Sequence, residues 1–394
     1  MPSTARCRLS PRGLGGALTR CPTMPAGAVP PCPNHILQAV DNHLSSIQER
    51  FLWVMLVPEF LVAVAGNGLA LYRFRTREPR PWHPGVVFSA QLATSDLLYA
   101  LTLLPQAAYF YPPKHWRYGL ALCLLERFLF TCNLLGSTVF ISCISLNRYL
   151  GVVHPFFTRS HLRPKHAWAL SAAGWALAAV LAAPTFHFTR LQVAQPCGNS
   201  SAQVPEGCTR CLGTASNSNL EAFWAYSLVL AGLGCGLPLL LTLAAYSALV
   251  RALQRSPSVT AAEKRRVAVL VASGLLLYAT SYVPYYVTRV LNLSARRWWN
   301  RQCPQFANVT QAREALDLGA YNAYQVARGL VPLAMCVHPL LYMAVASSLR
   351  CCHPRQPGGE DPDAKSSGQA LPLAGTTTRR VSETPELRPP TGPS

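Results

Sequence analysis

The chain has 394 residues, of which 50% are hydrophobic and 13% charged, and its formal net charge is +19. Soluble domains carry about 25% charged residues, so this composition favours a membrane protein. The positive charge alone would also suit a nucleic-acid-binding protein, but no soluble basic domain, zinc-ligand spacing or aromatic RNA-binding motif accompanies it. We therefore expect membrane lipids around the chain and no nucleic acid partner.

Residues 1–50 contain no apolar core long enough for a signal peptide, and we expect an extracellular, mostly disordered segment there. Seven apolar segments follow, each long enough to cross a hydrocarbon core of about 30 Å. They predict an all-α seven-transmembrane helix bundle over residues 51–349, and the Pro-, Gly-, Ser- and Thr-rich residues 350–394 predict a disordered cytoplasmic tail. The spans run approximately Phe51–Tyr72, Val86–Phe110, Cys123–Leu146, Ala167–Phe186, Ala222–Val250, Val267–Leu291 and Leu318–Ala346.

Orientation follows from the basic loops after the first, third and fifth spans. Lysine and arginine concentrate on the cytoplasmic side of membrane proteins, so the amino terminus is predicted to lie outside and the carboxyl terminus inside. Three glycosylation sequons, at Asn199, Asn292 and Asn308, then fall on the outer side. Asn292 lies so near the predicted membrane surface that its glycosylation is less expected than that of the other two. The basic loop residues are Arg73, Arg75, Arg77, Arg80, Arg159, Arg163, Lys165, Arg251, Arg255, Lys264, Arg265 and Arg266.

Six of the 14 cysteines belong to the predicted outer surface. That compartment is oxidising, so disulfides are expected, but six cysteines allow 15 pairings and spacing does not choose among them. Cys351 and Cys352 follow the last span directly, where cysteines are palmitoylation candidates. The outer cysteines are Cys32, Cys123, Cys197, Cys208, Cys211 and Cys303.

Short motifs occur in the predicted spans in a fixed order. Together they resemble the rhodopsin-like (class A) G-protein-coupled receptors over about residues 50–350. Each motif alone is weak, whereas the complete set in order is specific. The motifs are Gly66-Asn67, LATSD ending at Asp96, Asn147–Tyr149, Trp175, Pro238 with Tyr246, YVPY around Pro284 and His338–Tyr342.

Further segments are similar to the metabotropic purinergic nucleotide receptors, most closely to the ATP-preferring members. This resemblance implies a receptor for extracellular ATP and related nucleotides that couples to a Gq-class protein, phospholipase C and calcium, with Gs and cyclic AMP as a second route. The segments are LERFLFTCNLLGS (Leu125–Ser137), NRYLGVVHP (Asn147–Pro155), PYYVTR (Pro284–Arg289), YQVARGL (Tyr324–Leu330) and YPPKHWRYG (Tyr111–Gly119).

The same resemblance implies two disulfides. One joins Cys123 to Cys211 and ties the third span to the second outer loop. The other joins Cys32 to Cys303 and ties the amino terminus to the third outer loop. Cys197 and Cys208 then remain as a third pair.

Three arginines lie near the outer ends of different spans. Arg127 is one turn into the third span, Arg289 is five residues beyond a proline of the sixth, and Arg328 is eleven residues, about 16 Å, before a proline of the seventh. Guanidinium groups match phosphate oxygens with paired hydrogen bonds, and three of them suit the charge of a triphosphate. At about 1.5–3 kcal/mol for each charged hydrogen bond, they suffice for about micromolar binding. The alternative partners are lipid headgroups and the carboxylates Glu126, Glu314 and Asp317.

In the family, aromatic and amide groups beside the phosphates hold the nucleobase and ribose. One position departs from the family pattern, because Tyr286 stands where a histidine is usual and a titratable donor is lost. The matching positions are Tyr109, Phe130, Tyr286, Tyr324 and Gln325. Further outer arginines, Arg296, Arg297, Arg301 and Arg313, are expected to attract polyanions toward the site.

The resemblance places the residues that transmit activation in the cytoplasmic half. Arg148 contacts the G protein in this class, where an acidic neighbour is common, but the neighbour here is Asn147. The acidic partner expected on the sixth span falls at Lys264. Because no salt bridge then holds the inactive state, we expect ligand-independent signalling. The remaining switch and hinge positions are Tyr149, Tyr246, Pro284, Pro339 and Tyr342.

An allosteric sodium ion is the one cofactor that the class suggests, and no other metal is expected. Its ligands would be Asp96, the lone carboxylate in the middle of the second span, and Ser137. The third usual position is His338 here, so a hydrogen bond between Asp96 and His338 is expected to compete with sodium.

Other functions fit the sequence less well. An enzyme is not expected, because HExxH, GxxxxGK[ST] and GxSxG motifs are all missing from the sequence. A transporter would show paired, internally repeated halves. A retinal photoreceptor needs a lysine in the seventh span, and the sequence has none between Lys264 and Lys365. The main alternative is a receptor of the same fold for another anionic ligand, such as an acidic peptide or a lipid.

Overall fold

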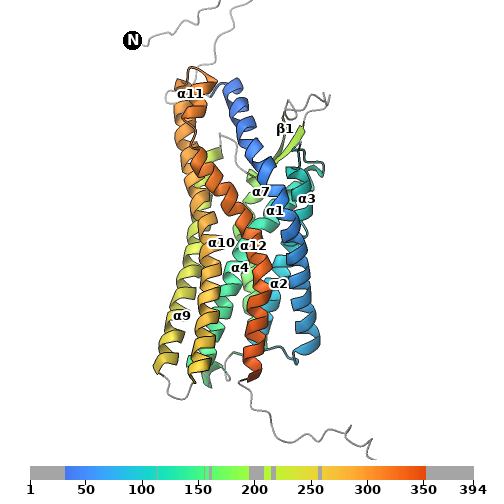
Figure 1. Ribbon diagram of the computed structural model, residues 1–394, viewed down its shortest axis with the longest axis vertical. Coiled ribbons are helices and arrows are strands. Elements are labelled where there is room, and N and C mark those ends of the chain that lie inside the picture. Colours follow the sequence, from blue (N-terminus) through green and yellow to red (C-terminus); the bar gives the residue numbers. More distant parts are fainter. Residues whose placement is uncertain are drawn as a thin grey trace, which may run out of the picture. The chain divides into compact units, whose positions relative to one another are not determined.

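The computed structural model describes residues 32–112, 114–154, 156–158, 162–194, 208–213, 219–255 and 260–351. Most of these residues are helical, and the long helices run side by side along one axis (Figure 1). Their bounds are α1 Asn34–Arg77, α2 Pro84–Ala100, α3 Leu103–Phe110, α4 Gly119–Val153, α6 Pro164–Ala182, α7 Thr185–Phe188, α8 Leu220–Val229, η2 Leu230–Gly236, α9 Leu237–Arg255, α10 Ala261–Gln302, η3 Cys303–Gln305, α11 Val309–Glu314 and α12 Leu318–Cys351.

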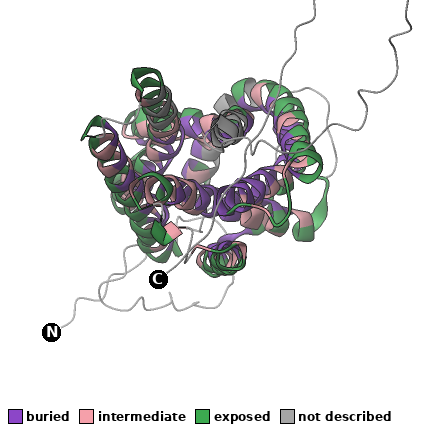
Figure 2. Ribbon diagram, turned by 90° about the horizontal axis from the view of Figure 1, so that it is seen from below, coloured by how far each residue is buried: buried purple, intermediate pink, exposed green. Residues whose placement is uncertain are grey.

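Five helical segments of the described chain are long and apolar enough to cross a membrane: Phe51–Arg77, Pro84–Phe110, Gly119–Val153, Pro164–Phe188 and Leu220–Arg255. They coincide with the first five predicted spans. The sixth and seventh predicted spans lie within α10 and α12, which run beside the others (Figure 1). Seen from below, the buried faces of the helices turn toward one another and the exposed faces turn outward (Figure 2). This arrangement is what a lipid-facing bundle requires.

Two spans depart from regular α-helix. The second is interrupted at Leu101 and Thr102, and the Thr102 hydroxyl donates to the Tyr99 carbonyl at 2.7 Å. The fifth contains the π-helical turn η2 directly before Pro238. Proline removes the N–H that would bond four residues back, so a wider turn at this point lets the helix continue.

The outer end carries a small additional core. Cys32, Ile36 and Val40 pack with Trp299 and other residues at the outer end of α10 and in α11. The Cys32–Cys303 disulfide ties the two segments together, with Cα atoms 5.4 Å apart. This packing explains why α1 already begins at Asn34, within a segment expected to be mostly disordered, and why α10 continues to Gln302 instead of ending near Leu291.

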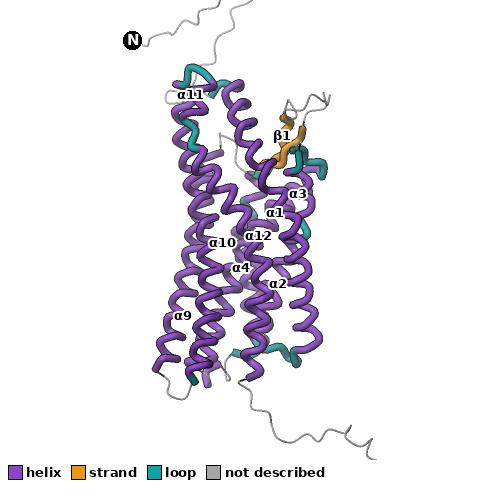
Figure 3. Tube along the Cα trace, viewed as in Figure 1, coloured by secondary structure: helices purple, strands orange, loops and turns teal. Residues whose placement is uncertain are grey.

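The second disulfide implied by the resemblance, Cys123–Cys211, joins α4 to strand β2 (Cys208–Leu212), with Cα atoms 5.8 Å apart. Strand β2 pairs antiparallel with β1 (Arg190–Ala194), and the two form a hairpin at the same end of the bundle as α11 (Figure 3). Cys208 is also disulfide-bonded, whereas Cys197, its expected partner, lies outside the described residues.

The predicted glycosylation and palmitoylation sites differ in their exposure and in whether they belong to the described residues. Asn308 is exposed and accepts a hydrogen bond from the Gln311 backbone N–H at 2.8 Å as the N-cap of α11. Asn292 is buried within α10 with 7% of its surface exposed, so we expect no glycan there. Asn199 and Cys352 lie outside the described residues, and Cys351 is the last residue of α12.

Candidate functional site

Arg328 projects from α12 among aromatic rings near the outer side of the bundle. Its guanidinium carbon lies 5.5 Å from the centre of the Phe110 ring and 6.0 Å from that of Phe130. Its Nη2 atom is buried and has no hydrogen-bond partner among the described residues. A buried cationic nitrogen in this state is costly, so Arg328 is suited to receive an anionic acceptor.

Arg289 is held by the protein itself. Its side chain is buried, Nε donates to the Ser227 hydroxyl of α8 at 3.2 Å, and Nη1 donates to the Tyr285 hydroxyl at 3.0 Å. Its guanidinium also lies over the Phe223 ring, 5.1 Å from the ring centre. These contacts turn Arg289 toward α8 and fix its charge in place.

Arg127 has an acidic partner. Its Nε lies 3.0 Å from Oε2 of Glu126, and Nη2 donates to the Cys211 carbonyl at 3.3 Å. Glu126 also accepts a hydrogen bond from the Gln106 amide through its other oxygen. One of the alternative partners considered from the sequence therefore does contact an arginine of the set.

A group of aromatic rings connects the surroundings of Arg289, which bonds to Tyr285, with those of Arg328, which lies 6.0 Å from the centre of the Phe130 ring. Phe130, Tyr285 and Tyr324 form this aromatic floor, with Tyr285 centred 5.5 Å from Phe130 and 5.9 Å from Tyr324. The Tyr285 hydroxyl lies in the electric field of both Arg289 and Arg328. Tyr109 similarly lies in the field of Arg127, Arg328 and Arg210 of β2. The cations thus line one region at the outer side of the bundle.

The other predicted contact residues divide into two groups. Gln325 is buried, and its Oε1 has no hydrogen-bond partner within the described part of the chain, so it retains an acceptor for a ligand. Tyr109 is buried against Trp116, 5.4 Å away in an edge-on contact. Tyr286 points toward η2, where a Cβ on Gly234 would lie 3.0 Å from the Tyr286 hydroxyl. Tyr109 and Tyr286 therefore pack against other parts of the protein.

Sequence reasoning missed Tyr285, which connects Arg289 to the aromatic floor. The signal was present, because residues four apart on a helix share a face and Tyr285 precedes Arg289 by four. Ser227 was also missed. A serine inside an apolar span carries no mark that identifies its partner.

Two of the arginines expected to attract polyanions are already paired with a carboxylate. Glu221 lies 2.5 Å from Arg297 and 3.2 Å from Arg301, which links α8 to α10. Arg313 contacts His43 Nδ1 at 2.9 Å, in an exposed position at the outer end. Exposed ion pairs contribute about 0–1 kcal/mol to stability. The nearby Glu221 partly cancels the positive charge of Arg297 and Arg301, and therefore weakens the expected attraction of polyanions without abolishing it.

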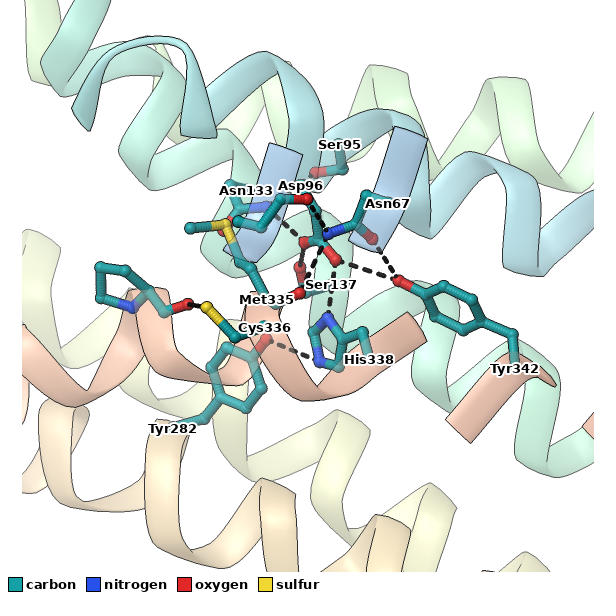
Figure 4. Close-up of polar contacts among 12 residues, drawn as sticks. Asn67, Ser95, Asp96, Asn133, Ser137, Tyr282, Met335, Cys336, His338 and Tyr342 are labelled. Carbon is teal, nitrogen blue, oxygen red and sulfur yellow. Dashed lines mark hydrogen bonds and ion pairs between the residues drawn. The ribbon is translucent and has the colours of Figure 1, made fainter. Parts of the chain in front are cut away.

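Asp96 is the centre of a buried polar network in the middle of the bundle (Figure 4). Its Oδ1 accepts from Asn133 at 3.0 Å and from the Ser137 hydroxyl at 3.5 Å. Its Oδ2 lies 2.7 Å from His338 Nδ1 and accepts from the Tyr342 hydroxyl at 3.2 Å. The side chains of Asp96 and His338 are fully buried. Buried polar groups need hydrogen-bond partners, and each oxygen of the Asp96 carboxylate has two donors.

The same network repairs the helix at Pro339. Proline has no N–H, so the Met335 carbonyl four residues earlier lacks its helical donor. Asn67 supplies one at 3.0 Å, and Asn67 in turn accepts from Tyr342 at 2.7 Å. Gly66 permits the approach of α1 and α12, because a Cβ there would lie 2.9 Å from Pro339 Cγ. Four motif residues from two spans thus form one unit.

The cytoplasmic end places Arg148 near His83 and Tyr246. His83 caps α2 by accepting a hydrogen bond from the Gly85 backbone N–H at 3.3 Å. Burial, and then the charge of Arg148, lower the pKa of His83, which favours the neutral ring that this bond requires. Tyr149 lies edge-on against His154 with ring centres 5.8 Å apart, and Pro284 lies inside α10.

Comparison with known proteins agrees with this architecture. The model of the seven-transmembrane receptors of the rhodopsin family matches residues 66–350. P2Y purinoceptor 11 of Homo sapiens is 67% identical over 357 residues, covering 89% of this chain and 95% of the relative. P2Y purinoceptor 1 is 31% identical in Gallus gallus, covering 78% of this chain and 79% of the relative, and 30% identical in Mus musculus, covering 78% and 77%. The chain belongs to the P2Y purinoceptors within the rhodopsin family of seven-transmembrane receptors, which are multi-pass proteins of the plasma membrane.

Proposed function

We propose that the chain is a cell-surface receptor for extracellular ATP and related nucleotides that signals through a heterotrimeric G protein. It is a receptor and not an enzyme, as its family membership shows. Arg127, Arg289 and Arg328 hold the phosphates, and the aromatic floor with Gln325 receives the nucleoside.

The observation that carries the proposal is the state of Arg328. Placing a guanidinium in the outer half of a membrane bundle costs free energy. Among the described residues, no acceptor bonds to Nη2 of Arg328 to offset this cost. The planar guanidinium can donate two parallel hydrogen bonds to two oxygens of a negatively charged phosphate. The adjacent rings of Phe110 and Phe130 exclude water, which strengthens such a contact.

The proposal extends to the G-protein class and the intracellular signalling route. We infer that a Gq-class protein, phospholipase C and calcium form the main route, with Gs and cyclic AMP as the second. Arg148, at the cytoplasmic end of α4 beside Tyr246, is the residue that contacts the G protein.

We also propose that protein donors replace the sodium ion of the class at Asp96. A sodium ion needs free oxygen acceptors, whereas each Asp96 oxygen is already engaged by two protein donors. The imidazole of His338 occupies the approach to Oδ2 at 2.7 Å. The residues as arranged therefore do not fit the ion.

The test is expression of the chain in cells without endogenous nucleotide receptors, with calcium and cyclic AMP read after adenine and uridine nucleotides are applied. Arg328→Ala should shift the ATP response to about tenfold higher concentration or more, since a charged hydrogen bond contributes about 1.5–3 kcal/mol. Arg301→Ala is the control for the loss of one positive charge at the outer surface, because this side chain is 66% exposed and lies 3.2 Å from the exposed Glu221. Equal potency of the wild type and Arg328→Ala would favour another anionic ligand.

A further inference from the structure

Glu126 is a carboxylate in an unusual position, on α4 among the residues of the nucleotide site. It is 1% exposed. One oxygen accepts from the Gln106 amide of α3, and the other lies 3.0 Å from Arg127 Nε. An ionised carboxylate buried to this extent is costly unless it is paired, so the Arg127 contact is what keeps the charge in place.

The surroundings of Glu126 contain a second cation. The electric field of Glu126 reaches Arg328, whose Nη2 has no hydrogen-bond partner among the described residues. The carboxylate therefore lies near two arginines from different helices. A phosphate group that engaged both arginines would meet Glu126 as a competitor for Arg127 and as a like charge.

We propose that Glu126 is a resident counter-anion that occupies Arg127 until a phosphate displaces it, and that it thereby sets the affinity and charge preference of the site. This inference rests on the proposed nucleotide function and adds a residue that opposes binding. It neutralises Arg127 in the unliganded site and raises the nucleotide concentration needed to fill the site. Repulsion grows with the charge of the ligand, so the opposition is strongest for triphosphates.

The direct test is Glu126→Gln, in which the amide oxygen still accepts from Gln106 while the charge is removed. Affinities of AMP, ADP and ATP are measured by competition against a radiolabelled nucleotide on membranes with matched receptor density. We expect ATP affinity to rise about tenfold, ADP affinity by less and AMP affinity least, in line with couplings measured for close charge pairs. Unchanged or lower affinity for all three nucleotides, or an equal gain for all three, would overturn the inference.

A second background separates competition from simple positioning. If Glu126 acts by occupying Arg127, the gain from Glu126→Gln should fall below about threefold for ATP when Arg127 is already Ala. A gain of the same size in both backgrounds would show that Arg127 is not the residue released. If Glu126 only orients Arg127 for the ligand, the single substitution should weaken binding, which also contradicts the proposal.

These measurements distinguish failure of the proposed nucleotide function from failure of the proposed role of Glu126. If the wild-type chain at the cell surface binds no nucleotide, the proposed function fails. If it binds ATP and Glu126→Gln changes nothing, only the role of Glu126 fails. Should Glu126→Gln not reach the surface, Glu126→Asp serves instead, because a shorter side chain withdraws the carboxylate from Arg127. It should raise ATP affinity about threefold, and no gain would overturn the inference.

Discussion

Tyr285 is the side chain that connects Arg289 to the rest of the proposed nucleotide site. It accepts a hydrogen bond from Arg289 Nη1 at 3.0 Å, and its ring contacts both other members of the aromatic floor. An arginine that loses one such partner keeps its charge but gains freedom to rotate. The hydroxyl of Tyr285 therefore serves orientation more than binding.

Replacing this hydroxyl isolates that role. Tyr285→Phe keeps the ring and should shift the ATP response to about three- to tenfold higher concentration, in keeping with about 0.5–1.5 kcal/mol for a hydrogen bond that orients Arg289 without contacting the ligand. Tyr278→Phe is the matched control, because Tyr278 is a buried tyrosine of the same helix that donates to Cys235 at 3.0 Å instead. Concentration–response curves for calcium measure both. Equal shifts for the two variants would mean that Tyr285 acts through general packing.

At the residue scale, the sequence predicts the depth of the arginines better than their partners. The distance of Arg328 from Pro339 places it near the outer surface, because helical rise is constant. Which acceptor each arginine meets depends on helix rotation and packing, and these are set by many weak contacts. Hence Ser227 and Tyr285 were missed, and Glu126 was only one of several alternatives for pairing.

The fifth span shows how one element depends on a single small residue. In the π-helical turn η2, a Cβ on Gly234 would lie 2.4 Å from Leu135 Cδ2, whereas a Cβ on Gly232 would meet nothing within 4 Å. Close packing of this span on α4 thus requires the absence of a side chain at one position and not at the other.

We expect Gly234→Ala to reduce the amount of receptor at the cell surface by about half or more, in keeping with an overpacking cost of about 1–3 kcal/mol. Gly232→Ala lies in the same turn and should stay at the wild-type level. Surface labelling of an epitope at the amino terminus measures both variants. Normal surface levels for Gly234→Ala would show that α4 and the fifth span can move apart at little cost.

The contact of Asp96 in α2 with His338 and Tyr342 in α12 leads us to expect that sodium has no effect on ATP binding. Because His338 and Tyr342 already engage Asp96 Oδ2, ATP affinity should stay constant when sodium is replaced by N-methylglucamine at an ionic strength of about 0.15 M. His338→Asn removes the imidazole, adds an amide oxygen and should make ATP affinity sodium-dependent. A sodium-dependent wild type would refute the proposal that protein donors replace the ion.

Most elements were predictable from the sequence because a span of about 20 apolar residues has few other uses. The break at Leu101 and the start of α1 at Asn34 were not. The first is a local choice between helix and turn within a uniformly apolar segment. The second depends on a disulfide and on packing against Trp299, which are contacts with residues far along the chain.

At the scale of the whole molecule, the proposed ligand contacts and the proposed G-protein contact, Arg148, lie at opposite ends of the helices. The Asp96 network and the Asn67–Met335 contact at Pro339 lie between these ends and connect α1, α2, α4 and α12. Helices linked in this way shift together more readily than singly. Activation is then a change in helix packing that both ends can bias.

The cytoplasmic end should hold the inactive state weakly. Asn147 and Lys264 stand where the class has acidic residues, so neither position offers a carboxylate that could form a salt bridge with Arg148. We expect inositol phosphate to accumulate without agonist in proportion to the amount of receptor expressed. Lys264→Glu restores a carboxylate and should lower this basal signal. Basal accumulation equal to that of untransfected cells would contradict the expectation.

Arginines from three helices are proposed to hold the phosphates of a nucleotide that arrives from outside the cell. Saturation binding of a radiolabelled, non-hydrolysable ATP analogue to intact cells tests it most directly, with the wild type compared with Arg127→Ala, Arg289→Ala and Arg328→Ala at equal surface density. We predict saturable binding to the wild type and a loss of affinity of about tenfold or more in each variant. Undiminished affinity in all three variants, or no saturable binding to the wild type, would contradict it.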